Sequence, residues 1–340
     1  MSIIDSMNRP TITDVARKCG LSKTTVSVIL NESAASLRVP PETQQRVRTA
    51  AMQLGYRPSW RARALTSRRT HMIGVLYTPP MPVVVRGNYE GIMVGINETL
   101  HAKRYHMLFV PLGDDPAEWG PVLLDQRMDG CLVLSRLRDP LPALLKQGRL
   151  PAVLVNADTE LPLSIVIADE YDAALQMMQH LIGLGHKQIS FFLGEHPPHF
   201  SITERKRGYV DSMKAAGLQE FVSIVECSEP ELVRRFKNDR NRPTAVLVYT
   251  HHMAVKLLQL FWEAGVQVPR DLSIATFSNA YPVEDVIPPL TTMALPTEEM
   301  GRAAAEILLD QIETRGDGPA RRIVLKEMLV VRRSTTTPRD

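Results

Sequence analysis

The feature that most constrains the fold lies near the N-terminus, in the segment TITDVARKCGLSKTTVSVILN (residues 11–31). Thr13 can cap a first short helix, because its hydroxyl can accept a hydrogen bond from a backbone N–H of the first turn. Val15, Ala16 and Cys19 then share the apolar side of this helix, and Gly20 ends it. A helix that stops after so few residues needs a second element to cover its apolar side.

A second short helix is predicted directly after this glycine. Ser22 can cap it, and Val26, Ile29 and Leu30 have the spacing of one apolar helical face. Two short helices joined by a glycine-containing turn predict a helix-turn-helix, whose second helix can lie in the DNA major groove. The outward residues that could reach bases and phosphates are Lys23, Thr24, Thr25, Ser27 and Val28. Many helix pairs turn at a glycine without contacting DNA, so this spacing alone leaves both alternatives open.

A third helix is predicted after a polar loop. Pro40 and Pro41 open it, and it ends at Leu54 before Gly55. Residues 56–58 (YRP) break the chain, and residues 60–65 (WRARAL) form a short basic segment with helical propensity.

The charge of the chain is unevenly distributed. The net charge of all 340 residues is +3, but residues 1–70 contain 12 Lys and Arg against 4 Asp and Glu, a net charge of +8. The remaining residues carry a net charge of −5. A basic N-terminal part on a mildly acidic body favours a polyanion-binding module joined to another domain. A solvated charged face is the alternative.

The order TIxDVAxxxGxSxxTVSxxLN, then ETxxRVxxAxxxLGYxP, then xxARxL closely resembles the headpiece of the LacI/GalR family of bacterial transcription regulators. The resemblance implies a sequence-specific DNA-binding regulator, a repressor, that binds a double-stranded DNA operator as a homodimer and responds to an unknown small-molecule effector. The implied recognition-helix contacts are Ser22, Lys23, Thr24, Thr25, Ser27, Val28 and Asn31. The family often has arginine at position 28, and valine can meet a thymine methyl group but cannot pair with guanine. We therefore expect an altered operator preference.

Residues 59–65 match the hinge helix of the family, which becomes ordered on DNA. By this resemblance Leu65 enters the minor groove, Ala62 packs closely, and Arg61 and Arg63 contact the backbone or groove. Tyr56 and Arg57 belong to the same set of expected DNA contacts. A helix of six or seven residues is unstable alone, so an effector that moves its surroundings could melt it and release the DNA.

Short apolar segments alternate with helical segments from residue 72 onward. Expected strands are 72–77, 106–110, 130–134, 152–155, 165–167, 189–193, 245–249 and 272–277, and expected helices are 89–103, 171–184, 203–216 and 252–265. This alternation predicts a doubly wound, parallel α/β fold long enough for two lobes. Motifs such as LIxLGH (181–186), RxxGY (205–209) and VPxDLS (268–273) resemble the type I periplasmic-binding-protein fold of the same family.

We therefore expect three segments: a helix-turn-helix headpiece (1–58), a hinge helix and linker (59–71), and an effector-binding and dimerisation domain (72–340). By resemblance, the lobe proximal to the DNA comprises 72–185 and 297–320, and the distal lobe 186–296 and 321–333. The apolar helix at 89–103 suits either a dimer face or the lobe core. The C-terminal residues 332–340 contain no heptad repeat, so we expect a dimer rather than a tetramer.

The ligand of such a fold lies in the cleft at the carboxyl ends of the strands. The effector contacts implied by the resemblance are Arg205, Asp169, Thr250, Ser278 and Tyr77. A surface or lobe-hinge role is the alternative for Arg205.

Several polar positions depart from the family pattern. Glu170 replaces an asparagine, and Thr250-His251 and Ser278-Asn279 replace carboxylate and amide pairs that hold sugar hydroxyls. A sugar effector is therefore in doubt. A constitutive regulator with a vestigial cleft is one alternative function.

Other chemistries have little support in the sequence. Four histidines, His196, His199, His251 and His252, lie in loops after strands and are therefore expected near the cleft. Their spacing is no strong metal motif, and hydrogen-bonding histidines are commoner. There is no GxSxG, P-loop or HExxH motif, so we expect neither catalysis nor a cofactor. We expect the three cysteines, Cys19, Cys131 and Cys227, to be reduced thiols. Neither a signal peptide nor a membrane-spanning segment is evident in the sequence. We expect a cytoplasmic protein. An exported solute-binding receptor, the other alternative, would need an export signal.

Overall fold

The structure is a computed structural model that describes residues 10–31, 38–57, 69–78, 88–134, 136–196, 198–239, 241–315 and 317–339. Contacts divide the chain into two compact units, Met1–His71 and Met72–Asp340. In the described residues, the first unit contains helices and no strand, and the second contains two sheets with flanking helices. The expected hinge residues 59–65 lie outside the described residues.

The described part of the first unit is a bundle of three helices, α1 (Ile12–Cys19), α2 (Lys23–Leu30) and α3 (Pro41–Leu54). Gly20 and Gly55 end α1 and α3 with φ of +63° and +65°, the left-handed conformation that glycine adopts most readily. The small core consists of Val15, Ala16, Cys19, Val26, Ile29, Val47, Ala50 and Ala51, each at most 8% exposed. The three predicted helices and their glycine stops are confirmed.

The predicted cap of the first helix was wrong by two residues. Thr11, not Thr13, precedes α1. The Asp14 carboxylate accepts hydrogen bonds from the Thr11 backbone N–H at 2.9 Å and from the Thr11 hydroxyl at 2.7 Å. These hydrogen bonds lower the pKa of Asp14. Ser22 caps α2 as predicted, because its hydroxyl accepts a hydrogen bond from the Thr25 N–H at 3.0 Å.

The first sheet of the second unit contains six parallel strands in the order β11-β5-β4-β3-β1-β2. Its central strands are fully buried runs, which is the pattern expected where helices cover both faces. The bounds are β1 (Met72–Tyr77), β2 (His106–Pro111), β3 (Gly130–Val133), β4 (Ala152–Val155), β5 (Ser164–Ala168) and β11 (Arg322–Leu325).

The second sheet has the order β12-β10-β9-β8-β6-β7. All its pairs are parallel except β10 with β12, which is antiparallel and lies at one edge. The bounds are β6 (Ile189–Phe192), β7 (Ser223–Val225), β8 (Ala245–Val248), β9 (Ser273–Phe277), β10 (Thr291–Ala294) and β12 (Met328–Val330). The predicted two-lobed, doubly wound α/β class is therefore confirmed, with one antiparallel edge strand.

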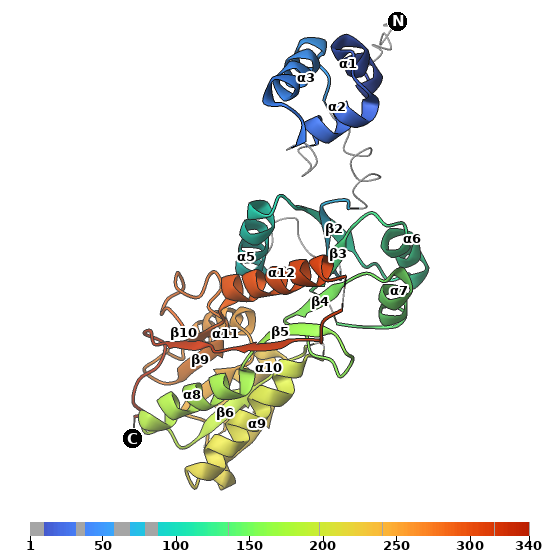
Figure 1. The fold of residues 1–340 in the computed structure, drawn as a ribbon. Helices are drawn as coiled ribbons and strands as arrows, with labels where there is room; N and C mark the ends of the chain where they lie inside the picture. The colour runs from blue at the N-terminus through green and yellow to red at the C-terminus, as the bar shows by residue number, and fades with distance from the viewer. Residues whose placement is uncertain are drawn as a thin grey trace, which may run out of the picture. The chain divides into compact units, whose positions relative to one another are not determined.

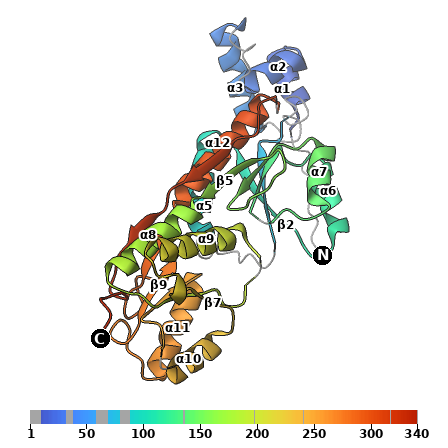
Figure 2. The same cartoon turned by 90° about the horizontal axis from the view of Figure 1, so that it is seen from below.

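Helices cover both faces of each sheet (Figures 1 and 2). On the first sheet, α5 (Asn88–Ala102) and α12 (Thr297–Glu313) share one face. The other face carries α6 (Trp119–Leu124), which follows the short turn η2 (Pro116–Glu118), and α7 (Leu141–Gly148). On the second sheet, α8 (Glu170–Gly183) and α9 (Phe200–Ala215) face one way. The opposite face carries α10 (Glu229–Asn238) and α11 (His251–Glu263), and the turn η3 (Gln219–Phe221) precedes β7.

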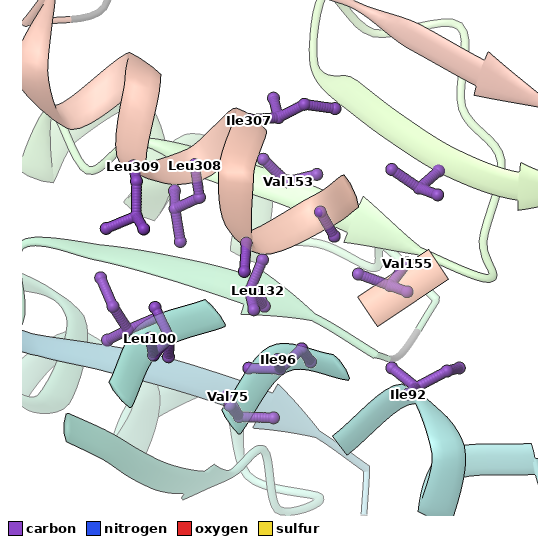
Figure 3. Close-up of a cluster of buried hydrophobic side chains, with 14 of the residues drawn as sticks. Val75, Ile92, Ile96, Leu100, Leu132, Val153, Val155, Ile307, Leu308 and Leu309 are labelled. Carbon is purple, nitrogen blue, oxygen red and sulfur yellow. The ribbon is translucent and has the colours of Figure 1, made fainter. Parts of the chain in front are cut away.

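The helices α5 and α12 pack with their backbones in close contact. A Cβ atom at Gly95 would collide with the Glu298 carbonyl oxygen, and one at Gly301 would collide with the Ile92 carbonyl oxygen. Between these helices and the sheet lies one hydrophobic core (Figure 3) that includes Ile92, Ile96, Leu100, Leu132, Val153, Val155, Leu308 and Leu309. Of the two alternatives for the apolar side of this helix, lobe-core packing is the one observed.

Two elements lie in a different lobe from the one expected. Helix α8, predicted within the proximal lobe, packs on the second sheet through residues such as Met177, Met178 and Leu181. Strand β11, predicted within the distal lobe, pairs with β5 in the first sheet. The chain crosses between the sheets at three places, between β5 and α8, between β10 and α12, and between β11 and β12. The expected boundary between residues 296 and 297 coincides with the crossing between β10 and α12. The boundaries after residues 185 and 320 missed the other two crossings, because a lobe change needs only a few residues.

The cysteine expectation agrees with the structure. Cys19 and Cys131 are buried, Cys227 is partly buried, and all three are free thiols. Burial raises the pKa of the Cys131 thiol to about 12, so it stays protonated. Over the described part of the chain, no helix combines the length and apolar character needed to cross a bilayer.

Candidate functional site

The expected DNA-reading helix presents polar side chains at its N-terminal end. Ser22, Lys23 and Thr24 are exposed, whereas Thr25, Ser27 and Val28 are half-buried. The exposed end of α2 is the part of a recognition helix that meets base edges. Val26 and Ile29 are fully buried beneath it, which fixes the rotation of the helix and so the direction of its outward residues.

The remaining expected DNA contacts are placed less uniformly. Asn31 donates a hydrogen bond to the Ser27 hydroxyl at 3.1 Å. Tyr56 packs against the headpiece core, and Arg57 is exposed. The expected hinge contacts Arg61, Ala62, Arg63 and Leu65 lie outside the described residues.

A cavity of about 700 Å³ lies between the two lobes of the second unit. The carboxyl ends of β1, β3 and β4 supply one wall, and the loops and helix starts after β5, β6, β8 and β9 supply the other. Four of the five expected effector contacts line it, namely Tyr77, Arg205, Thr250 and Ser278. Two lining residues, Asn156 and Ser278, have φ of +56° and +76°, a conformation that is uncommon outside glycine and often marks a binding site.

Arg205 lies in the wall of this cavity and is only 5% exposed. Its Nε donates to Glu170 Oε2 at 2.6 Å, and its Nη1 donates to the Tyr249 carbonyl oxygen at 2.8 Å. The guanidinium also lies 4.1 Å from the centre of the Phe277 ring. The alternative of a solvated surface arginine is therefore excluded. Arg205 is a buried, paired cation whose partners fix its plane.

The fifth expected effector contact, Asp169, is not among the described residues that line the cavity. It is the cap of α8, and its Oδ1 accepts a hydrogen bond from the Asp172 N–H at 3.0 Å. The carboxylate that reaches the cavity is that of Glu170, one residue later. The acid that lines the cavity is therefore one residue later than the one expected, because the first of the two adjacent acids serves as the helix cap.

Sequence reasoning missed a third member of this charged cluster. Glu327 lies in the crossing between β11 and β12, is 2% exposed, and neither of its carboxyl oxygens has a hydrogen-bond partner among the described residues. Burial raises the pKa of Glu327 well above its usual range, and the Glu170 carboxylate raises it further. No local signal could have found Glu327, because 157 positions separate it from Glu170 in the sequence.

The four histidines predicted to lie near the cleft all line it. His199 caps α9, and its Nε2 lies 2.9 Å from the Asn156 carbonyl oxygen in the opposite wall. The His196 ring lies 4.9 Å from that of Tyr249, and the rings of His251 and His252 are 3.8 Å apart. Burial lowers the pKa of His199, and it lowers that of His251 to about 4. Among the described residues, no group of three or more His, Cys, Asp or Glu is arranged to hold a metal ion.

These two sites define a class of protein: a helix-turn-helix headpiece followed by a two-lobed domain with a ligand-sized cleft. Residues 11–59 match the profile of the bacterial regulatory proteins of the lacI family, and residues 178–335 match that of the periplasmic binding protein-like domain. The HTH-type transcriptional regulator DegA of Bacillus subtilis is 30% identical over 96% of this chain and 98% of its own length. The repressor PurR of Photobacterium profundum is 30% identical over 95% of this chain and 98% of its own.

Solved structures agree over nearly the whole chain. The complex of the transcriptional regulator CelR with cellobiose aligns with a TM-score of 0.69 at 28% identity, covering 96% of this chain and all of that one. The lac repressor dimer bound to its operator and an anti-inducer aligns with a TM-score of 0.80, covering 96% of this chain and 99% of that one. At 23% identity, that second likeness shows the fold alone.

The chain belongs to the LacI family. It is a DNA-binding transcriptional regulator with an effector-binding domain, as the sequence predicted. The relatives named here are regulators rather than enzymes.

Proposed function

We propose that this protein is a homodimeric repressor whose operator affinity is switched by a small molecule in the interlobe cavity. The observation that supports the proposal is the cavity itself, because residues of both lobes line it. A ligand that contacts both lobes stabilises one arrangement of the lobes, open or closed, relative to the other. Arg205, Thr250, Ser278 and Tyr77 are its proposed effector contacts, together with Glu170 in place of Asp169. Because its operator is DNA, the proposed location of the protein is the cytoplasm.

The headpiece contributes the specificity in this proposal. Ser22, Lys23 and Thr24 read bases or phosphates from the exposed end of α2, and the remaining contacts come from Thr25, Ser27, Val28, Asn31, Tyr56 and Arg57. Leu65 is the proposed minor-groove wedge, flanked by Arg61, Ala62 and Arg63. Replacement of Leu65 by alanine should weaken binding to the operator far more than binding to unrelated DNA, since only the operator complex contains the kinked step. Equal losses on both DNAs would contradict the wedge.

The homodimer is proposed from exposed apolar side chains on the first sheet. Phe109 on β2 is 47% exposed, and Val94 on the neighbouring helix α5 is 40% exposed. Strand β2 is an edge of its sheet, so its outer side is open to a second copy. Sedimentation of the full chain tests this proposal, with a single species near 38.1 kDa as the result that contradicts it.

A constitutive regulator with a vestigial cleft is the second candidate. Its cavity would have no ligand to complete the buried polar atoms of Asn156 and His251, which have no hydrogen-bond partner among the described residues. The test is a low-salt DNA-binding assay on fragments of the source genome, repeated with a metabolite library whose members are first screened by thermal shift. A library member that stabilises the protein and changes DNA affinity supports the switch. Specific DNA binding that no stabilising compound changes supports the constitutive alternative.

A further inference from the structure

Three helices begin at the cavity wall. Glu170 is the first residue of α8, His199 and Ser201 stand at the start of α9, and Thr250 and His251 stand at the start of α11. Each of these helices has at least 13 residues, long enough for a developed dipole. The first backbone N–H groups of a helix lack partners within it, and together with the dipole they attract negative charge.

His251 supplies an independent observation at the same place. It is 4% exposed and lines the cavity, and neither ring nitrogen has a hydrogen-bond partner in the described part of the chain. Two unsatisfied nitrogens on one buried ring are costly unless a ligand completes them. Burial and the adjacent His252 hold the pKa of His251 down at about 4, so the ring is neutral while the cavity contains no anion.

The charged side chains that line the cavity are Arg136 and Arg205 and the two glutamates Glu170 and Glu195. Arg205 and Glu170 neutralise each other through their ion pair of 2.6 Å. Arg136, on the opposite wall, forms no ion pair within the described residues, and its charge is felt by His199. Glu195 is the remaining acid of the cavity and is exposed, as Arg136 is, and its charge also acts on the Cys227 thiol. His196 and His252 complete the titratable groups of the wall.

The hydrogen-bonding groups of the cavity wall also favour a negatively charged ligand. A neutral polyol donates a proton from every hydroxyl and so needs acceptors in the wall. The Glu170 carboxylate is already engaged with Arg205, which leaves the side-chain oxygen of Asn156 as the buried lining oxygen without a partner in the described chain. Donors come from the Arg136 guanidinium, from one N–H of His251 and from the starts of α9 and α11, where the caps already engage the N–H groups of Ser201 and Met253. A donor-rich wall fits an acceptor-rich ligand.

We propose that the effector is an anion, a small metabolite with a phosphoryl or carboxylate group held between His251 and Arg136 at the helix starts of α9 and α11. This inference rests on the proposed function, since it names the ligand class of the same cavity. On binding, the anion would lose water of hydration and accept charge-assisted hydrogen bonds from the cavity wall instead. It would also favour a proton on His251, so binding and proton uptake would be linked.

The test is calorimetric titration of the full chain with inorganic phosphate and with malonate, which separate the two anion sources, and with glucose as a neutral polyol. We expect one or both anions to bind and glucose to bind at least tenfold more weakly. Arg136→Gln should weaken anion binding about tenfold or more. The matched control is Arg207→Gln, because Arg207 is an exposed cation on α9 that does not line the cavity, and it should leave binding unchanged. Glucose binding without anion binding, or no anion binding at all, would overturn the inference.

The role of His251 is tested with sulfate, whose charge stays constant over the pH range used. Uptake of one proton should strengthen sulfate binding by up to about tenfold per pH unit as the pH falls from 8 to 5.5. His251→Gln keeps a polar side chain and should remove this dependence, and circular dichroism checks that it folds. A pH profile that is the same in both proteins overturns the assignment of the anion to His251. An anion that binds without changing DNA affinity would instead contradict the proposed switch, so the two failures are distinguishable.

Discussion

The headpiece and the interlobe cavity differ in how much water surrounds their polar side chains. On α2, Lys23 and Thr24 are exposed, and the residues beneath them are fully buried aliphatics. In the cavity wall the arrangement is reversed, because Arg205, Glu170 and His251 are themselves 5% exposed or less. The polar side chains of the headpiece therefore lie in solvent over an apolar core, whereas those of the cavity wall are themselves buried in a lobe.

This difference predicts where stability and binding are coupled. An exposed charge interacts weakly with its neighbours through water, so replacing it changes DNA binding and leaves folding intact. A buried charge that loses its partner pays the full desolvation penalty. Substitutions in the cavity should therefore affect both folding and ligand binding, and substitutions of exposed residues such as Lys23 and Thr24 on α2 should affect DNA binding alone.

The largest effect is expected for Arg205→Ala. It leaves Glu170 and Glu327 as two buried carboxyl groups without a cation, and we expect the free energy of unfolding to fall by about 3–5 kcal/mol. Denaturant unfolding followed by circular dichroism measures this loss. Arg207→Ala, on the exposed side of the same helix, is the control and should have a much smaller effect. Equal effects of the two substitutions would remove the contrast between buried and exposed charge.

The next effect concerns the proton on Glu327. The folded protein holds this proton to a higher pH than the unfolded chain, so stability is lost as the pH rises above the usual glutamate pKa. Glu327→Gln removes this loss. The free energy of unfolding of the variant should gain on the wild type by up to about 1.4 kcal/mol per pH unit until the raised pKa is passed. Unfolding curves from pH 4 to 8 test this, and parallel pH profiles would show that Glu327 is ionised in the folded protein.

On the headpiece, Lys23→Ala should reduce DNA affinity without changing stability. A lost phosphate contact lowers the magnitude of the salt slope by about one, which corresponds to about five- to tenfold weaker binding at 0.1 M salt. Gel shifts at several salt concentrations measure both quantities. An unchanged affinity would mean that Lys23 faces solvent in the complex.

The smallest effect is expected for Ser22→Ala. It removes the hydroxyl that accepts the Thr25 N–H, and loss of such a cap costs about 1 kcal/mol. Hydrogen exchange of the α2 amides in the full chain should accelerate, while exchange in the second unit stays the same. Faster exchange in both units would contradict the independence of the headpiece core.

The sequence by itself determined the local elements and the headpiece. Apolar spacing, Ser22, Gly20 and Gly55 place the three helices within a residue of their observed ends, except for the start of α1, which lies two residues earlier than predicted. Caps and stops can be read from the sequence because they act over one turn. The continuous apolar strands likewise predicted two covered parallel sheets. The positions of Arg205, Thr250, Ser278 and Tyr77 in the cavity were also predicted, but through the resemblance to a family rather than through local chemistry.

The tertiary structure alone decided which distant groups meet. The crossings between the lobes bring Glu327 beside Glu170 and Arg205, and they assign α8 and β11 to their sheets. It also decided that the Asp169 carboxylate caps helix α8, whereas Glu170 lines the cavity. The physical reason is that the burial and pairing of charged side chains depend on contacts between residues more than a hundred positions apart. The sequence pattern reports only neighbours within the same helix or strand.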